Sequence, residues 1–353
     1  MGAPDLTKDE FGERAWKGAL LFESNFGRTM SANISQTQMQ AGIQTLPAEW
    51  RDFFALTKPR VMTLVIFTAI CGLLAAPGTI HPVLGFTAVL AIAMGAGGSA
   101  VLNQWWEAVI DAGMKRTANR PLPGGRIHRD DARDFGMFLS GVSLLLMGVA
   151  IGWLAAALLL TAIIYYAVVY TMWLKPRTPQ NIVIGGGAGA FPPLIGWVAV
   201  TGEVTAMPLL LFAIIFMWTP PHFWALALFV KTDYAKVGIP MLPVVAGERT
   251  TRNHIWVYTL LLAPFTIAPW VIGGTSWVYG TTALALSLLF IALALPVARR
   301  DAVMGAGDPM AEEIRLFKFS VVYLFVLFAA LVADRILENA GLIGPGLFAG
   351  GLL

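Results

Sequence analysis

The stretch VLGFTAVLAIAMGAGGSAVLNQWWEAVID, residues 83–111, joins a long uncharged run to three polar residues at regular spacing. Asn103, Glu107 and Asp111 follow one another at intervals of four residues at the end of that run. Because an α-helix rises about 1.5 Å per residue, side chains four residues apart share one face of the helix. The stretch therefore predicts a helix that crosses a membrane and ends in a face bearing two acids and an amide.

The composition of the whole chain supports a membrane protein. Of its 353 residues, 57% are hydrophobic and 13% are charged, with a mean hydropathy of +0.70. Soluble domains carry roughly one quarter charged residues, so an integral membrane protein is predicted. The net charge of +3 is too small to suggest a nucleic-acid partner. The single cysteine, Cys71, excludes a disulfide within the chain and a metal site built from cysteines.

Nine apolar segments are long enough to span a bilayer, each with about 17 to 25 residues. We place them at residues 60–77, 83–106, 135–154, 157–174, 181–201, 207–230, 255–273, 277–296 and 315–334. The turns at 154–158 and 273–277 are the tightest. The predicted fold is all-α, a bundle of nine transmembrane helices.

The loops between these segments indicate the orientation. Lysine and arginine precede the first span and follow the second, fourth, sixth and eighth, whereas the loops between contain neither. Basic residues accumulate on the cytoplasmic side, so we predict a cytoplasmic N-terminus and a periplasmic C-terminus. The acidic end of the second span then faces the cytoplasm.

Three regions follow from this division of the chain. Residues 1–50 form a polar N-terminal extension, residues 51–335 the nine-helix membrane domain, and residues 336–353 a short C-terminal tail. The extension carries too many acids for a transit peptide and has no apolar core of the kind that a secretory signal needs. Met30 is an alternative start that leaves a short polar lead into the first span.

Two of the predicted cytoplasmic loops resemble each other. The first contains Pro121–Pro123 (PLP) and the second Met241–Pro243 (MLP), and each is followed by glycine and arginine. They lie 120 residues and four spans apart. This spacing suggests two related halves whose long loops meet on one side of the bundle.

The polar face at the end of the second span suggests a site rather than a solvated helix end, because ionisable residues at membrane depth usually line a cavity. Carboxylate and amide oxygens suit Mg²⁺, which commonly joins such ligands to a substrate phosphate. Lys115, Arg116 and Arg120 follow within two turns and are suited to phosphate oxygens. A phosphorylated head beside a membrane implies a hydrocarbon tail, so an allylic prenyl diphosphate is the expected substrate. Candidates to shelter its carbocation are Trp105, Trp106, Trp218, Phe223 and Trp224.

These residues carry a resemblance to a known family. NQWWEAVIDAGMKRTANRPLP, residues 103–123, resembles the N-x-x-x-D/E-x-x-x-D signature of the UbiA superfamily of membrane-embedded prenyltransferases. Further blocks resemble its protohaem-farnesylating branch: KPRVMTLVIFTAICGL, LKPRTPQNIVIGGGAGAFPPLIGWVAVTG and WTPPHFWALALFVKTDYAKVGIPMLPVVAGE. The resemblance covers residues 57–250 and implies a central cavity capped by the two long loops on the cytoplasmic side.

The resemblance also implies a reaction and a setting. The farnesyl group of farnesyl diphosphate would join the 2-vinyl group of haem B, and water would complete a hydroxyethylfarnesyl substituent. The product, haem O, would serve terminal oxidases in the inner membrane of a bacterium. Haem B enters as a substrate, Mg²⁺ as the cofactor, and haem A synthase or oxidase assembly factors as possible protein partners.

The resemblance also implies roles for individual residues of this sequence. Asn103, Glu107 and Asp111 would hold Mg²⁺, and catalysis would further involve Arg116 and His222. Lys115, Arg116, Arg120, Lys231 and Asp233 would contact the diphosphate. The sixth span departs from the D-x-x-x-D of relatives that prenylate phenols, because it offers His222 and then Asp233, the one candidate for a second metal ligand. His222, Trp224, Arg177 and Arg249 are haem candidates, with Lys175, Lys231 and Arg252 also available to propionates.

The role of His222 stays open between a structural residue, a ligand of haem iron and a base near the vinyl carbon. Gly185 and Gly189 of the GGGAGA run, 185–190, have the spacing that lets membrane helices pack closely. A transporter is one alternative function, although the acids cluster at one end instead of on several spans. A prenyltransferase for a quinone precursor or a chlorophyll-type acceptor is the other.

Overall fold

The computed structural model describes residues 48–301 and 310–344, and this part of the chain is helical without any strand. The described residues all belong to one compact unit. Most of the N-terminal extension predicted for residues 1–50 and half of the tail predicted for 336–353 lie outside the described residues.

Nine predicted spans each correspond to a helix or to a pair of consecutive helices. They are α4 (Pro59–Ala75), α5 (Pro82–Gly113), α6 (Arg129–Ala150), α7 (Trp153–Ile164) with η1 (Tyr165–Leu174), α8 (Asn181–Gly185) with α9 (Gly187–Thr201), α10 (Ala206–Phe229), α13 (Gly247–Val271), α14 (Trp277–Arg299) and α15 (Ala311–Asn339). Eight of these are long and apolar enough to cross a membrane alone. The ninth counts when α4 is joined to α3 (Trp50–Leu56), which precedes it at a bend of 57°.

Two boundaries differ from the predicted ones. Helix α5 continues to Gly113, beyond the end of the span predicted at 83–106, and includes the polar face as its spacing predicts. The turn between the third and fourth spans lies at Ile151 and Gly152, not at 154–158. Gly152 has a φ of 155°, which residues with a side chain rarely adopt, so the glycine ends α6 where hydropathy alone does not.

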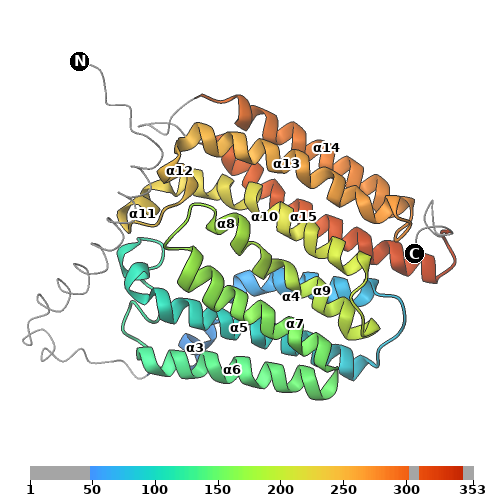
Figure 1. Cartoon of the computed structure of the whole chain (residues 1–353), viewed down its shortest axis with the longest axis horizontal. Coiled ribbons are helices and arrows are strands. Elements are labelled where there is room, and N and C mark those ends of the chain that lie inside the picture. The colour runs from blue at the N-terminus through green and yellow to red at the C-terminus, as the bar shows by residue number, and fades with distance from the viewer. Residues whose placement is uncertain (1–47, 302–309, 345–353) are drawn as a thin grey trace, which may run out of the picture. The chain divides into compact units, whose positions relative to one another are not determined.

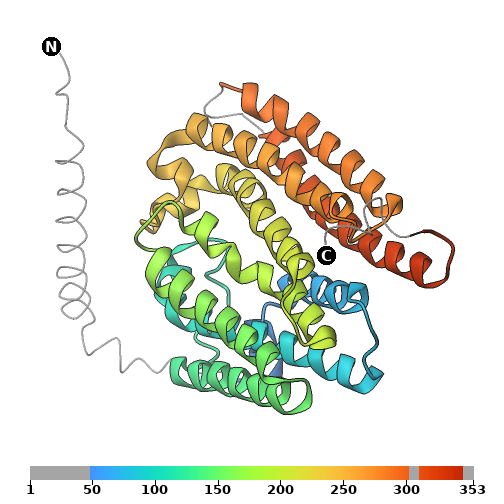
Figure 2. The same cartoon turned by 45° about the vertical axis from the view of Figure 1, so that its right-hand side comes forward.

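The helices form two groups, as Figure 1 shows. In one, α5 packs on α6, α4 on α9, and α7 on both α6 and α9; in the other, α13 packs on α14 and α14 on α15. Helix α10 contacts α9 in the first group and α13 and α15 in the second. The turned view in Figure 2 shows the same division. The fold thus confirms an all-α bundle.

Helices α4 and α9 approach each other at backbone distance. A Cβ atom on Gly72 would lie 2.2 Å from the carbonyl oxygen of Pro193, and one on Gly196 would lie 2.2 Å from that of Ala69. Only glycine allows such an approach, which is the packing that small residues give membrane helices. Cys71 lies beside this contact and is buried, with 2% of its surface exposed.

The two long loops meet at the end of the bundle where α5 stops, which we call the polar end. The second loop carries α11 (Lys231–Lys236) and α12 (Leu242–Val245). A Cβ on Gly113 would lie 2.8 Å from Val237 of this loop, and Met114 joins the apolar cluster that contains Tyr234 and Met241. The predicted meeting of the loops is confirmed.

A chain of buried charges joins the second loop to the last three long helices. Arg252 of α13 donates to Glu313 of α15 at 2.9 Å, and Glu313 also accepts from Arg300 at 2.9 Å. One turn before Arg252, Glu248 pairs with Lys231 of α11 at 3.3 Å. Arg252 and Glu313 are almost fully buried. The network anchors the second loop at the polar end.

Candidate active site

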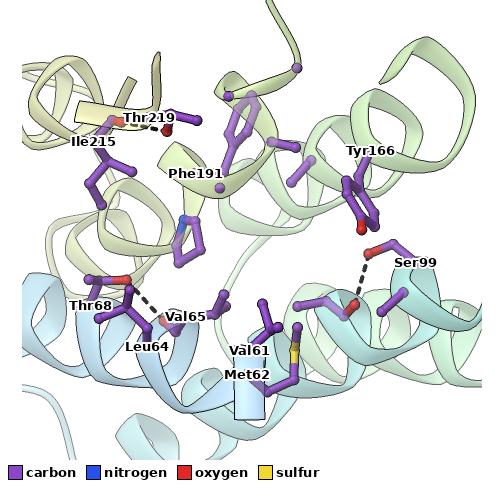
Figure 3. Close-up of a pocket in the computed structure, with 18 of the residues that line it drawn as sticks. Val61, Met62, Leu64, Val65, Thr68, Ser99, Tyr166, Phe191, Ile215 and Thr219 are labelled. Carbon is purple, nitrogen blue, oxygen red and sulfur yellow. Dashed lines mark hydrogen bonds between the residues drawn. The ribbon is translucent and has the colours of Figure 1, made fainter. Parts of the chain in front are cut away.

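A cavity of about 340 Å³ lies between α4, α5, η1, α9 and α10. Figure 3 shows Val61, Met62 and Val65 of α4 on one side of it and Tyr166 and Phe191 on the other. Its hydroxyl groups are bonded back to their own helices. Thr68 donates to Val65, Ser99 to Ala96 and Thr219 to Ile215. The wall is therefore apolar in effect and suits a hydrocarbon ligand.

Asn103, Glu107 and Asp111 lie together on the buried face of α5 at the polar end, as predicted from their spacing. Their exposed fractions are 2%, 3% and 1%. Lys58, which lines the cavity, donates to the amide oxygen of Asn103 at 2.7 Å. The amide nitrogen of Asn103 donates to the hydroxyl of Thr171 at 2.9 Å. The helix end is a built site with defined partners, not a solvated terminus.

Each carboxylate has its own cation. Lys175 donates to both oxygens of Glu107 at 2.6 Å, and Arg120 donates to Oδ2 of Asp111 at 2.6 Å. The hydroxyl of Thr117 donates to the backbone oxygen of Asp111 at 2.7 Å and fixes the loop that carries Arg120. The other carboxylate oxygen, Oδ1 of Asp111, is buried without a hydrogen-bond partner.

The basic side chains around this face outnumber the acids. Lys58, Arg120 and Lys175 are three basic groups, against the two carboxylates of Glu107 and Asp111. Basic groups in a partly buried site attract an anion more strongly than they would in water. Arginine and lysine also donate the charge-assisted hydrogen bonds that phosphate oxygens accept. The polar end beside the cavity is thus suited to a phosphorylated group.

Segment η1 is a π-helix that faces the end of α5. In a π-helix each backbone N–H bonds to the carbonyl five residues earlier, so side chains five apart share a face. Tyr166 and Thr171 are related in this way, as are Tyr170 and Lys175. The rings of Tyr166 and Tyr170 stack with centroids 5.6 Å apart. The π-helix presents two aromatic rings, a hydroxyl and a cation to the same site.

Lys58 has an unusual backbone. It precedes Pro59 and adopts the left-handed conformation, with a φ of 55° and a ψ of 59°. A residue with a side chain is strained there, and such strain clusters at functional sites. The strained position starts α4 and places the Lys58 ammonium group 3.4 Å from the hydroxyl of Tyr166 as well as on Asn103.

His222 lines the cavity on α10 and is held on three sides. Its ring stacks between Trp218 and Phe317, with centroids 4.2 and 4.8 Å away. Its Nδ1 lies 2.6 Å from the hydroxyl of Ser320, which itself donates to the backbone oxygen of Phe317 at 2.6 Å. Because the hydroxyl has one hydrogen, Nδ1 must be the donor to Ser320. A neutral imidazole then keeps its lone pair on Nε2.

The remaining diphosphate candidates differ in position. Lys115 and Arg116 are exposed on the first loop. Lys231 pairs with Glu248, and Asp233 pairs with Lys236 of its own helix at 3.7 Å. Burial raises the pKa of Tyr234 on α11, and the charges of Arg116 and Glu107 also act on it. Helix α11 thus lies over the polar end, while the two ion pairs direct Lys231 and Asp233 to other partners.

The structure does not bring the other haem candidates to the cavity. Trp224 is fully buried and contacts His254 and Tyr258 edge-on. Arg177 donates to the backbone at the end of η1, at Met172 and Trp173. The last candidates lie at the other helix group: Arg249 donates to Ala298 of α14, and Arg252 belongs to the buried network.

The glycine run matches the packing prediction in part. A Cβ on Gly185 would lie 2.1 Å from the ring of Tyr170, so this glycine permits close packing. Gly189 lines the cavity instead, and a Cβ there would meet nothing within 4 Å. Sequence spacing gave both the same role, and the helix break between α8 and α9 separates them.

Sequence reasoning missed Lys58, Thr171 and Ser320 as site residues and placed Lys175 at haem. A lysine directly before the proline that opens the first span was the available signal for Lys58. Thr171 and Ser320 carry no local signal, because their partners lie 68 and 98 residues away in the sequence.

The donor set at the polar end is chemically of the kind that suits a magnesium ion, while in this structure Lys58 bonds the amide oxygen of Asn103 and Lys175 bonds both oxygens of Glu107. Over residues 48–301 and 310–344, no three acidic, histidine or cysteine side chains gather to hold a metal, so an amide must complete the set. Asn103, Glu107 and Asp111 supply only oxygen ligands, and Mg²⁺ prefers these. Oδ1 of Asp111 is the buried oxygen that still lacks a partner.

An all-helical membrane protein with an apolar cavity and a cationic, carboxylate-bearing polar end belongs to the class that handles phosphorylated substrates with hydrocarbon tails. Residues 64–305 match the UbiA prenyltransferase family. The chain belongs to this family and is a membrane-embedded prenyltransferase enzyme.

Relatives and solved structures agree with this assignment. Protoheme IX farnesyltransferase of Erythrobacter litoralis is 73% identical over 292 residues, which cover 83% of this chain and 94% of the relative. The structure of a digeranylgeranylglyceryl phosphate synthase is similar, with a TM-score of 0.68 at 17% identity over 81% of this chain and 98% of the other. A UbiA homologue from Archaeoglobus fulgidus, bound to GPP and Mg²⁺, has a TM-score of 0.55 at 15% identity over 80% and 99%.

Proposed function

We propose that this protein transfers the farnesyl group of farnesyl diphosphate to the 2-vinyl group of haem B, giving haem O and diphosphate. The supporting observation is an apolar cavity with Lys58 in its wall, and this lysine joins the cavity to the buried cluster of basic side chains and carboxylates at the polar end. The relative from Erythrobacter litoralis bears the name of this activity at 73% identity. We assign the activity to the membrane domain, residues 51–335.

The polar end would bind the diphosphate and promote its departure. Lys58, Lys175 and Arg120 would donate to its oxygens, with Lys115 and Arg116 closing from the first loop. Mg²⁺ held by Asn103, Glu107 and Asp111 would neutralise part of the charge that develops on the leaving group. Asp233 remains a proposed ligand of a second ion, and Lys231 a proposed diphosphate contact.

The rest of the reaction takes place in the cavity. Breaking the C1–O bond leaves an allylic carbocation, which the faces of Tyr166 and Tyr170 would shelter. The terminal vinyl carbon forms a bond to C1, and the cation left beside the porphyrin takes up water and loses a proton. The free Nε2 of His222 is suited to accept that proton or to contact the haem, and the two roles remain to be separated.

We further propose the setting that the sequence predicts. The protein would lie in the bacterial inner membrane with the polar end toward the cytoplasm, an inside N-terminus and an outside C-terminus. Haem A synthase or oxidase assembly factors would be its protein partners. Trp224, Arg177 and Arg249 stay predictions as haem contacts, since their present partners are protein groups.

The experiment supplies purified protein in nanodiscs with haem B, farnesyl diphosphate and Mg²⁺. Mass spectrometry should find a haem that has gained a farnesyl group and a hydroxyl group, in equal amount to released diphosphate. Parallel samples receive a phenolic quinone precursor in place of haem. Prenylation of the phenol with unchanged haem would assign the protein to the alternative activity.

A further inference from the structure

The cavity ends at a defined depth below the polar end. On each helix that lines it, the deepest lining residue is Thr68 on α4, Ile92 on α5, Leu159 on α7, Ile195 on α9 and Ile215 on α10. Ile92, Leu159 and Ile195 belong to a packed apolar cluster that continues below the cavity. These three buried side chains form what we call the floor.

The floor is backed by the contact between α4 and α9. Ala69, directly after Thr68, has its carbonyl oxygen 2.2 Å from the place where a Cβ of Gly196 would lie, and Gly196 directly follows Ile195. Backbone in contact with backbone leaves no room for a ligand to pass between these two helices. The lower boundary is therefore main chain between α4 and α9, and packed side chains of the floor between α5, α7 and α9.

The depth can be measured along two helices. Ile92 lies eleven residues from Asn103 on α5, and Thr68 lies ten residues from Lys58. At the rise of an α-helix these intervals correspond to roughly 16 and 15 Å. A carbon chain advances about 1.3 Å per single bond, so an extended farnesyl chain spans roughly 14 Å and a geranylgeranyl chain roughly 19 Å.

We propose that the floor of Ile92, Leu159 and Ile195 limits the substrate to three isoprene units. This inference rests on the proposed function and extends it to chain length. A farnesyl chain with its diphosphate at the polar end fills the cavity to the floor, and a fourth unit collides with it.

Gly189 provides a way to fill the cavity above the floor. It lies six residues before Ile195, or roughly 9 Å above the floor along α9. Because a Cβ at Gly189 meets no atom within 4 Å, a larger side chain enters the cavity without displacing protein. Since the floor lies roughly 15 Å below the polar end, a leucine there should occupy space beside the first two isoprene units.

The test compares geranyl, farnesyl and geranylgeranyl diphosphates as donors to haem. Ile92→Ala and Leu159→Ala should raise the kcat/KM of the geranylgeranyl donor relative to farnesyl by about tenfold, the discrimination that a pocket gains from small changes in size. Gly189→Leu should reduce geranyl and farnesyl transfer alike by about tenfold, because it fills space beside the units that both donors share. Controls are Ile255→Ala, a buried change on α13, and Gly141→Leu, at a glycine of α6 that also has nothing within 4 Å.

The outcomes separate the two proposals. Absence of farnesylated haem with the unchanged protein contradicts the proposed function itself. If the unchanged protein is active, an unaltered donor preference in both floor variants contradicts the length limit. Gain of the longer donor cannot arise from misfolding, because a poorly folded variant loses activity with every donor.

Discussion

Asp111 is a buried carboxylate with one oxygen paired to Arg120 and the other without a hydrogen-bond partner. An unsatisfied anionic oxygen is costly in a buried site unless a ligand uses it. We expect Asp111→Asn, which removes charge and little volume, to reduce haem farnesylation at least about 100-fold while folding is kept. Chromatography of the extracted haem across a Mg²⁺ titration measures the farnesylation rate and its dependence on the metal.

Asp131→Asn is the matched control for this change, because Asp131 is exposed on the first turn of α6. It should leave both the rate and the Mg²⁺ dependence as they are. Full activity of Asp111→Asn at the same Mg²⁺ concentration would remove Asp111 from the metal site.

Ser320 decides which nitrogen of His222 carries the hydrogen. Ser320→Ala removes the acceptor at 2.6 Å, so the imidazole loses its fixed tautomer and orientation. We expect turnover to fall about tenfold, Ser320→Thr to restore most of it, and His222→Ala to abolish product. Haem titration followed by absorbance adds a second readout, because an iron ligand shifts the Soret band and a base does not.

Ser140→Ala serves as control, since Ser140 is a buried serine bonded to its own helix. If His222→Ala and Ser320→Ala lower only the amount of folded protein, with activity per folded molecule unchanged, His222 is structural.

At the scale of residues, the sequence could predict which side chains share one face of a helix, because spacing alone decides this. Asn103, Glu107 and Asp111 were placed on one face because the helical repeat alone requires it. Their partners Lys58, Lys175 and Thr171 come from other elements, and only packing brings them together. The assignment of Lys175 to haem illustrates this limit. The sequence showed that Lys175 is basic and lies in a loop predicted to be cytoplasmic, but its partner depends on the π-helix that precedes it.

At the scale of elements, the buried ionic network determines how the second loop is held. Glu313→Gln removes a charge that compensates Arg252 and Arg300, and breaking a buried pair costs about 3 to 5 kcal/mol. We expect a clear fall in the thermal unfolding midpoint of the protein in detergent, accompanied by reduced activity because α11 loses its anchor through Glu248 and Lys231.

The neighbouring change Glu312→Gln is the control for the network. Glu312 pairs with Arg300 but is 46% exposed, and exposed pairs contribute about 1 kcal/mol or less. Equal effects of the two changes on the unfolding midpoint would show that burial does not govern this network.

Hydropathy predicted the number and order of the spans because a membrane imposes length and apolarity on each one. It could not predict that η1 winds as a π-helix, since both helix types are equally apolar. It also missed the bend of 57° between α3 and α4, where Lys58 takes its left-handed conformation. These irregular elements carry the site, which is why the site was predicted less fully than the fold.

At the scale of the whole molecule, the orientation of the helices in the membrane can be tested with one thiol reagent. Cys71 is the single cysteine and is buried, so the native chain should not react with a membrane-impermeant maleimide. We expect Thr205→Cys, at the exposed start of α10, to be labelled in intact cells. Asp131→Cys should be labelled only after the membrane is opened, because positive loops stay inside.

The opposite labelling pattern would reverse the predicted orientation and place the polar end outside the cell.

The meeting of the two long loops was predicted from the repeat of PLP and MLP, since related halves bring equivalent loops together. The resemblance implied a central cavity, but its depth could not be predicted, because it depends on the contact of Gly72 and Gly196 with backbone of the opposite helix.

The basic cluster at the polar end has a consequence for turnover. If Lys58, Lys175 and Arg120 bind the diphosphate as proposed, the diphosphate that remains after transfer still meets the same three basic side chains. Inorganic diphosphate should therefore compete with the prenyl donor whatever the acceptor is. The enzyme would depend on hydrolysis of its own by-product to keep working, and adding a pyrophosphatase should sustain a reaction that otherwise slows.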